Sequence, residues 1–508
     1  MNKNNDVFIK KMIHQVCNYL QRESNFLLTV YKTLWVAIAM MPLTLLAQKH
    51  TDLPLEYLDR SFHIYDQVQK EIWSNPELGF LETKSSNILQ NHLQEQGFKV
   101  ETGVAGMPTS FIATYGSGSP VIGILAEFDA LPRLSQDTVF YRKPMEEGGN
   151  GHGCGHNLLG TGAVAGAVAI KEWLASSNHQ GTIKVFGSPA EEGGGGKVYL
   201  ARDGFFKGVD VVLDWHPGTR NIVDVGNGFS AVQMVDYTFH GKASHAAGSP
   251  HRGRSALDGV EALNYMVNML REHIPTASRI HYVITNGGDA PNVVPELATV
   301  SYYIRHPNRD VLKDLVAWVN QAAEGAALGT QTTVESEIIS GFYEKLPNRT
   351  LAELIQKNLE AVGGVHYNDR ECAFAVQMAE QLGVKPSVLD RVTAVQPLPD
   401  ERPSTGGGST DVGDVTWNVP TITFGTAAFI PGSSAHSWQW TAAGGTTIGT
   451  KALINAAKVF ALTAIDLYTT PSLIEEAWKE FESRRGPDFK YEPLLGDRAP
   501  ALNYQVKK

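Results

Sequence analysis

Four short segments of this 508-residue chain carry side chains that bind metal ions or move protons. The first spans residues 151–157 and reads GHGCGHN, with Cys154 and His156 two positions apart. This Cys-x-His spacing puts a thiolate and an imidazole within reach of one cation, and the glycines let the backbone approach closely. A phosphate-binding loop is disfavoured because its lysine and hydroxyl residue are missing. A plain turn is the other alternative.

Adjacent glutamates form the second segment. Residues 188–194 read SPAEEGG and follow the apolar run TIKVFG. Neighbouring side chains in an irregular loop point in different directions, so one of Glu191 and Glu192 can bind metal. The other, desolvated beside it, can serve as a general base with a raised pKa. The alternative interpretation is a solvated acidic surface.

Single histidines follow two further apolar strands. His216 lies in DWHPG and His436 in SAHS, and either histidine alone would more often be structural. Together the four segments supply five candidate ligands: Cys154, His156, Glu192, His216 and His436. Five ligands exceed the need of one tetrahedral structural zinc and suit two metals that share a bridge, which indicates a two-metal hydrolase. Sulfur, nitrogen and oxygen donors suit Zn²⁺ and do not exclude Mn²⁺ or Co²⁺.

A sheet is needed to bring these segments together. Hydrophobic periodicity predicts short buried strands over residues 121–128, 182–186 and 209–215 and helices over 57–73, 83–96, 158–175 and 447–468. Strands that alternate with helices predict a mostly parallel sheet, whose active site lies at the carboxyl ends of its strands. The candidate ligands follow those ends.

Residues 228–341 have a different predicted order of strands and helices, βαββαβ. The predicted elements are strands over 229–241, 279–285, 297–304 and 332–340 and helices over 255–272 and 310–327. A split unit of this kind forms its own ferredoxin-like sandwich. We therefore expect an α/β fold in which a mostly parallel-sheet catalytic domain, residues 48–227 and 342–508, is interrupted by an inserted lid domain.

The first 47 residues predict a signal peptide. An uncharged run of sixteen residues, 33–48, lies behind basic residues and is shorter than a bilayer span of about 20. We expect an exported protein, periplasmic or secreted; an uncleaved anchor or a buried helix is the alternative. Only Cys154 and Cys372 follow the leader, too few for a disulfide framework. The formal charge of -10, with no basic stripe, argues against nucleic-acid binding.

Several motifs in order carry a family resemblance. They are NPELGFLETK (75–84), AEFDALP (126–132), GHGCGHNLLG (151–160), SPAEEGGGGK (188–197), DWHPG (214–218), GKASHAAGSPHRGRSALDGVEALN (241–264) and APNVVPE (290–296). The sequence resembles the amidohydrolase branch of the aminoacylase and glutamate-carboxypeptidase metallopeptidase superfamily, and within it the p-aminobenzoyl-glutamate hydrolase subgroup. The resemblance covers nearly the whole chain after about residue 55.

The resemblance implies two divalent metal ions, Zn or Mn, held by the five candidate ligands, with Glu191 as the catalytic carboxylate. It also implies that the lid forms a homodimer and that His245 reaches the partner's active site. Asn292 and Arg305 match positions that hold the substrate's carboxylate and backbone in relatives. From the residues alone, His245 would more often be an ordinary loop histidine and Arg305 an exposed strand cation, and the motif match reverses that preference. Whether a second subunit type is needed stays open.

One departure concerns the metal bridge. The wider superfamily has a His-x-Asp metal pair where this chain reads Glu127-Phe128-Asp129, so the resemblance implies that Cys154 and His156 take over those metal positions. Which of the two bridges the metals stays open at this point.

The expected activity is hydrolysis of the amide bond of an N-acyl or N-aroyl amino acid. p-Aminobenzoyl-glutamate is the leading substrate, and a dipeptide or another N-acyl amino acid is the alternative. Glu191 would take a proton from water activated by the metals, His245 would donate to the oxyanion, and Arg305 would pair with a carboxylate. A thiol hydrolase using Cys154 is disfavoured because His156 lies too close along the tight loop, and a non-catalytic binding protein is disfavoured by the intact Glu191.

Overall fold

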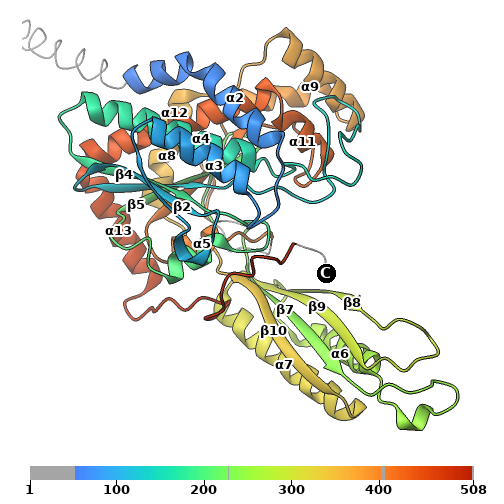
Figure 1. Cartoon of the computed structure of the whole chain (residues 1–508). Coiled ribbons are helices and arrows are strands. Elements are labelled where there is room, and N and C mark those ends of the chain that lie inside the picture. The colour runs from blue at the N-terminus through green and yellow to red at the C-terminus, as the bar shows by residue number, and fades with distance from the viewer. Residues whose placement is uncertain (1–51, 227, 402–406, 506–508) are drawn as a thin grey trace, which may run out of the picture.

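A computed structural model describes residues 52–505 except residues 227 and 402–406. The expected signal peptide, residues 1–47, lies outside the described residues. The described chain forms a large α/β body and a smaller, elongated body that extends from it (Figure 1).

The large body is built on a seven-stranded sheet in the order β1-β2-β4-β3-β5-β11-β6. Its strands are β1 (Lys99–Thr102), β2 (Phe111–Ser117), β3 (Val121–Ala126), β4 (Gly181–Gly187), β5 (Val211–Gly218), β6 (Ile222–Asp224) and β11 (Thr421–Ala427). The neighbours β4, β3, β5 and β11 are parallel, whereas β2 and β6 run against their neighbours. The expectation of a mostly parallel sheet is confirmed, but the sequence analysis did not identify β1, β2 or β6.

Both faces of the central strands are buried. In β3, Ile124 belongs to the apolar core on one face and Leu125 to the core on the other. Strands covered on both faces are continuously apolar, which explains the run that predicted β3. The helices of this body are α2 (Phe62–Trp73), α3 (Thr83–Glu95), α4 (His156–Ser176), α5 (Gly196–Arg202), α8 (Arg349–Val362), α9 (Asp369–Gln381), α10 (Val412–Thr416), α11 (Trp438–Gly444), α12 (Thr447–Thr469) and α13 (Pro471–Arg485).

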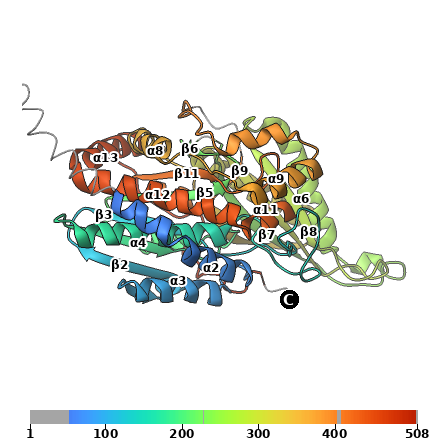
Figure 2. The same ribbon diagram turned by 90° about the horizontal axis from the view of Figure 1, so that it is seen from above.

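Helices α4 and α12 run side by side over one face of the sheet (Figure 2). Gly162 lets α4 approach the sheet closely, because a Cβ there would lie 2.8 Å from the ring of Trp215 on β5. Both helices are long and apolar enough to cross a membrane, but 83% and 78% of their most apolar windows are buried inside the fold. Core helices pass the same test, so their composition is weak evidence for a membrane span.

The smaller body contains a four-stranded sheet in the order β10-β7-β9-β8 with two helices. Its elements are β7 (Ala231–His240), α6 (Ala256–Leu270), β8 (Arg279–Asn286), β9 (Leu297–His306), α7 (Arg309–Thr330) and β10 (Thr333–Phe342). This order is the predicted βαββαβ unit, and every strand pair is antiparallel. Alternate residues of β9 are buried, including Val300, Tyr302 and Ile304, which is typical of a sheet covered on one face. We refer to this body as the lid.

Candidate metal centre

The carboxyl ends of three parallel strands and the start of helix α4 position the candidate ligands. Glu192 follows β4, His216 lies near the end of β5, and His436 lies in the loop after β11. Cys154 and His156 lie at the start of α4. Between them Gly155 has a φ of 85°, a left-handed conformation that glycine adopts without steric cost. The five side chains therefore meet at one edge of the sheet, although 282 positions separate Cys154 from His436 along the chain.

One set of ligand atoms comes from Cys154, His156 and His216, which lie within 4.8 Å of one another. The Cys154 sulfur is 3.4 Å from His216 Nε2. Nδ1 of His216 lies 2.9 Å from the carbonyl of Pro217, which leaves Nε2 for the site. Burial, reinforced by nearby His156, lowers the pKa of His216 to about 4, so this imidazole is neutral and can bind a cation at neutral pH.

A second set consists of Cys154, Glu192 and His436, again within 4.8 Å of one another. His436 Nε2 lies 3.3 Å from Glu192 Oε1. The backbone N–H of His436 donates to the carbonyl of Gly153 at 2.9 Å, which ties the loop after β11 to the glycine-rich loop. Cys154 is common to both sets. His156 is shared in the same way between the first set and a third group formed with Glu127 and Glu191, so both residues remain candidates for the bridge that the sequence left open.

Unpartnered polar atoms show that these residues fit a metal pair. In the described part of the chain, His156 Nε2, Glu192 Oε1 and Glu127 Oε2 are buried without a hydrogen-bond partner. His156 Nε2 and Glu127 Oε2 lie 3.2 Å apart but do not form a hydrogen bond. Buried polar atoms are rarely left unpaired, and a mixed sulfur, nitrogen and oxygen donor set suits divalent cations such as Zn²⁺.

Asp129 orients two of the ligands. Its Oδ1 lies 2.8 Å from His156 Nδ1, and its Oδ2 accepts the backbone N–H of Glu192 at 2.9 Å. A carboxylate on one imidazole nitrogen fixes the ring so that the other nitrogen faces the metal. The AEFDALP motif contains Asp129, but the sequence analysis gave this residue no role.

A buried lysine was also missed. Lys197 Nζ lies 2.6 Å from Glu127 Oε1 and 2.6 Å from Asp411 Oδ1, and all three side chains are inaccessible or nearly so. Although burial raises the pKa of Glu127, Lys197 and His156 together hold it below its usual value. Glu127 and Lys197 stand within the AEFDALP and SPAEEGGGGK motifs, which was the available signal, but their contact was not visible in the pattern.

Glu191 lies beside the ligands and, together with Cys154, Glu192, His216 and His436, lines a cavity over the site. Burial, with the charges of Glu127 and Glu192, raises its pKa well above its usual value. This direction agrees with the sequence expectation for a general base. Burial also raises the pKa of the Cys154 thiol, which disfavours the alternative of a thiolate nucleophile acting without a cation.

A cavity of about 610 Å³ opens over these side chains. Phe229, Phe424 and Trp440 contribute apolar walls, and Arg220 and Lys345 contribute cations. This volume is in the range of sites that enclose a small organic ligand, and apolar walls with a few polar groups are typical of such sites.

The three residues expected to contact the substrate or the oxyanion, Arg305, His245 and Asn292, lie at different distances from the metal site. Arg305, on β9, donates from Nη1 to Ser409 Oγ at 2.7 Å, and Ser409 lines the cavity. His245 and Asn292 lie in lid loops, where the Asn292 carbonyl accepts the N–H of Ala246 at 3.0 Å. Among the described residues, none of Arg305, His245 and Asn292 lines the metal-site cavity itself, although Arg305 contacts it through Ser409.

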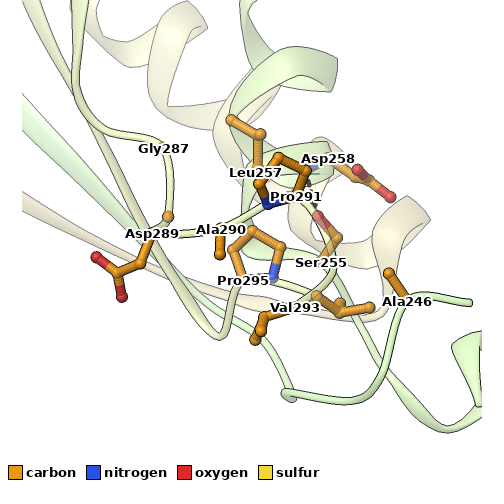
Figure 3. A pocket seen from close by; sticks show the side chains of 12 residues that line it. Ala246, Ser255, Leu257, Asp258, Gly287, Asp289, Ala290, Pro291, Val293 and Pro295 are labelled. Atoms are coloured by element: carbon orange, nitrogen blue, oxygen red, sulfur yellow. Dashed lines mark hydrogen bonds between the residues drawn. The ribbon is translucent and has the colours of Figure 1, made fainter.

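The lid loops enclose a pocket of their own. It has a volume of about 600 Å³ and is lined by Ala246, Val293 and Pro295 among others (Figure 3). His245 pairs with Val293 in an isolated bridge, and its Nδ1 accepts the N–H of Gly248 at 3.0 Å. Within one chain, the structure therefore leaves His245 and Asn292 away from the metal ligands.

Comparison with known proteins gives consistent matches. Residues 123–464 match peptidase family M20/M25/M40. The chain is 38% identical over 457 residues to a subunit of p-aminobenzoyl-glutamate hydrolase from Escherichia coli (strain K12), a match over 82% of this chain and 92% of that protein. It is 30% identical over 444 residues to the Xaa-Arg dipeptidase of Mus musculus, covering 84% and 91%. A solved structure of a dinuclear metal-binding peptidase from Bacillus subtilis matches with a TM-score of 0.54 at 18% identity, over 81% of this chain and 99% of that one.

Proposed function

Because the chain belongs to peptidase family M20/M25/M40, it is a metal-dependent hydrolase of amide bonds, and we propose that its substrate is p-aminobenzoyl-glutamate. The observation that carries this proposal is the meeting of five ligand side chains beneath one cavity, with Glu191 beside them. The sequence similarity to the Escherichia coli p-aminobenzoyl-glutamate hydrolase supports the choice of substrate. The similarity to an Xaa-Arg dipeptidase supports the alternative, a dipeptide.

Two cations share the centre in this proposal. Cys154, His156 and His216 would hold one, and Cys154, Glu192 and His436 would hold the other. The donor set suits Zn²⁺ and does not exclude Mn²⁺. Divalent cations bound there would polarise the amide carbonyl and lower the pKa of water toward neutrality.

Glu191 carries the proton in this reaction. Its carboxylate accepts a proton from the attacking water and later delivers it to the nitrogen of the leaving amine. The raised pKa of Glu191 supports this role, because a carboxylate with a raised pKa is a stronger base for a proton of water.

Arg305 is the proposed partner of the substrate's free carboxylate. A guanidinium binds a carboxylate through two parallel hydrogen bonds. Its contact with Ser409 supports this assignment, since that hydroxyl lies at the wall of the cavity. His245 and Asn292 would complete the site from the partner subunit, with His245 donating to the developing oxyanion.

A homodimer through the lid follows from that assignment. β8 is an edge strand of the lid sheet and leaves Val283 60% exposed, and α6 leaves Tyr265 68% and Met269 51% exposed. An apolar surface beside an unpaired sheet edge favours association. Light scattering of the purified chain tests this proposal. One relative is named as a subunit, so a complex with a second chain type is the alternative.

We further propose export, which rests on residues 1–47 alone. Fractionation of expressing cells, with sequencing of the mature N-terminus, tests it.

A substrate panel tests the function. The purified full chain would be stripped of metal, reloaded with Zn²⁺ or Mn²⁺, and assayed with p-aminobenzoyl-glutamate, benzoyl-glycine and an Xaa-Arg dipeptide. We expect the highest kcat/KM for p-aminobenzoyl-glutamate and no turnover with a chelator. A higher kcat/KM for the dipeptide would show that a dipeptide, and not p-aminobenzoyl-glutamate, is the substrate. If the metal-loaded protein turned over none of these compounds, the proposed function would be overturned.

A further inference from the structure

The C-terminal tail holds the loop that carries Glu191 and Glu192. Tyr504 Oη donates a hydrogen bond to the backbone carbonyl of Glu192 at 2.9 Å. The backbone N–H of Glu192 donates to Asp129 Oδ2, also at 2.9 Å. Both polar groups of this residue's backbone are thus fixed by side chains that lie far away in the sequence.

The loop needs such restraints because its backbone is strained. Ala190, next to Glu191, has a φ of 59°, a left-handed conformation that is unfavourable for a residue with a Cβ. Strained residues persist where the surrounding structure holds them. Glu82 Oε1 holds Ala190 from one side by accepting its N–H at 2.8 Å. Tyr504 restrains the loop two residues further on, through its hydrogen bond to the Glu192 carbonyl.

Packing around the tyrosine is close. A Cβ on Gly79 would clash with Tyr504 Oη and lie 2.8 Å from the Cβ of Ala190, so the tail, the loop and the segment before α3 are in direct contact. The rings of Phe80 and Tyr504 pack edge to face with centroids 5.8 Å apart. The tyrosine is therefore held in one position by its neighbours.

The same tail is attached to both bodies. Gln233 on β7 donates to the carbonyl of Leu494 at 2.6 Å, and Arg498 pairs with Glu337 on β10 at 3.0 Å. Arg202 of α5 donates to the carbonyl of Arg498 at 2.7 Å. In Figure 1 this dark red segment lies where the lid joins the large body. The tail thus reaches the Glu191–Glu192 loop from anchors on both sides of the junction.

We propose that Tyr504 is a positioning residue for the metal centre. Its hydroxyl restrains the Glu192 carbonyl and thereby orients the Glu192 carboxylate toward the cation and Glu191 toward the substrate. The roles of Glu191 and Glu192 in this statement rest on the proposed function. Tyr504 itself takes no part in the chemistry.

The test compares two substitutions that each remove one hydroxyl. Tyr504→Phe removes the bond to Glu192. Tyr468→Phe is the control, because the hydroxyl of Tyr468 likewise donates to a backbone carbonyl, that of Thr182 at 2.7 Å, at the start of β4 and away from the ligands; Tyr468 is buried, whereas Tyr504 is partly buried. Cation affinity of the metal-stripped protein would be measured by competition with a chromogenic chelator, together with kcat and KM.

For Tyr504→Phe we expect cation affinity and kcat each to fall by about three- to tenfold, the range for loss of one hydrogen bond, with KM within about twofold. Amide hydrogen exchange over residues 190–196 should become faster. Tyr468→Phe should leave the affinity, kcat and exchange of that loop within about twofold of the unsubstituted protein while lowering the melting temperature.

Equal cation affinity, kcat and loop exchange in the two variants would overturn the role of Tyr504. If the unsubstituted chain hydrolyses no N-acyl amino acid, the proposed function fails. The affinity and exchange comparisons still decide the position of Tyr504 in that case, because neither needs a substrate.

Discussion

The ammonium group of Lys197 lies 2.6 Å from Glu127 Oε1, and neither side chain reaches solvent. Asp411 contacts the same ammonium at 2.6 Å. One buried lysine therefore compensates two buried carboxylates directly behind the metal ligands. Breaking a buried ion pair is costly because the remaining charge has neither water nor a partner.

Lys197→Met should destabilise the protein by about 3–5 kcal/mol, the range for removing one member of a buried ion pair. Urea unfolding of the metal-stripped protein measures this difference. Lys143→Met is the control, since Lys143 pairs with Asp137 at the surface and its loss should leave the free energy of unfolding unchanged. Equal effects of the two substitutions would contradict a special energetic role of the Lys197 contacts.

Glu191→Gln should lower kcat by at least about a hundredfold, because the amide cannot accept the proton of the attacking water. Metal content, measured by mass spectrometry, should stay normal. Glu192→Gln is the informative comparison, since loss of a ligand should lower metal content as well as turnover. Near-normal turnover of a metal-replete Glu191→Gln protein would remove Glu191 from its role.

Metal binding should release protons. Burial raises the pKa of the Cys154 thiol. Burial lowers the pKa of His156, but Cys154, Asp129 and Glu127 together raise it well above its usual value. These two neighbouring groups therefore retain protons at neutral pH, and those protons must leave when a cation binds. Affinity should thus fall as the pH falls, by up to about a hundredfold per pH unit for two protons.

Calorimetric titration in buffers with different ionisation enthalpies counts these protons. Cys154→Ser should release one proton fewer than the unsubstituted chain, because a serine hydroxyl stays protonated. Binding without any proton release would show that the sulfur and the imidazole are not ligands.

His245→Ala should abolish most activity if His245 acts across a homodimer. Mixing it with Glu191→Gln should restore about a quarter of the full activity, because half of the dimers are then mixed and each has one intact site. Subunit exchange would be verified by mass spectrometry of the mixture. Absence of recovery despite exchange would show that the two residues do not serve a shared site.

Local sequence patterns predicted much of the architecture. The switch from short apolar runs to alternating strands marked the lid, and its βαββαβ order is the one observed between β7 and β10. The ligand residues were recognisable because their types are rare and because each follows a strand or a glycine-rich turn. Hydrophobic periodicity and residue type are local properties of the sequence, so both can be interpreted without knowledge of the fold.

The positioning contacts were not predictable in this way. Lys197 and Asp411 are 214 positions apart, and Tyr504 lies 312 positions after Glu192. Lys197 follows four glycines and Tyr504 lies in a polar tail. Nothing in the neighbouring sequence indicates that either side chain is shielded from solvent or which residue it contacts.

The sequence by itself determined which side chains are available for metal chemistry and which elements carry them. Only the tertiary structure decided that Cys154 and His156 each belong to two ligand sets, that Lys197 pairs with Glu127 and Asp411, and that Tyr504 donates to the Glu192 carbonyl. The physical reason is that these contacts depend on how strands from distant parts of the chain are ordered in one sheet, which no local pattern encodes.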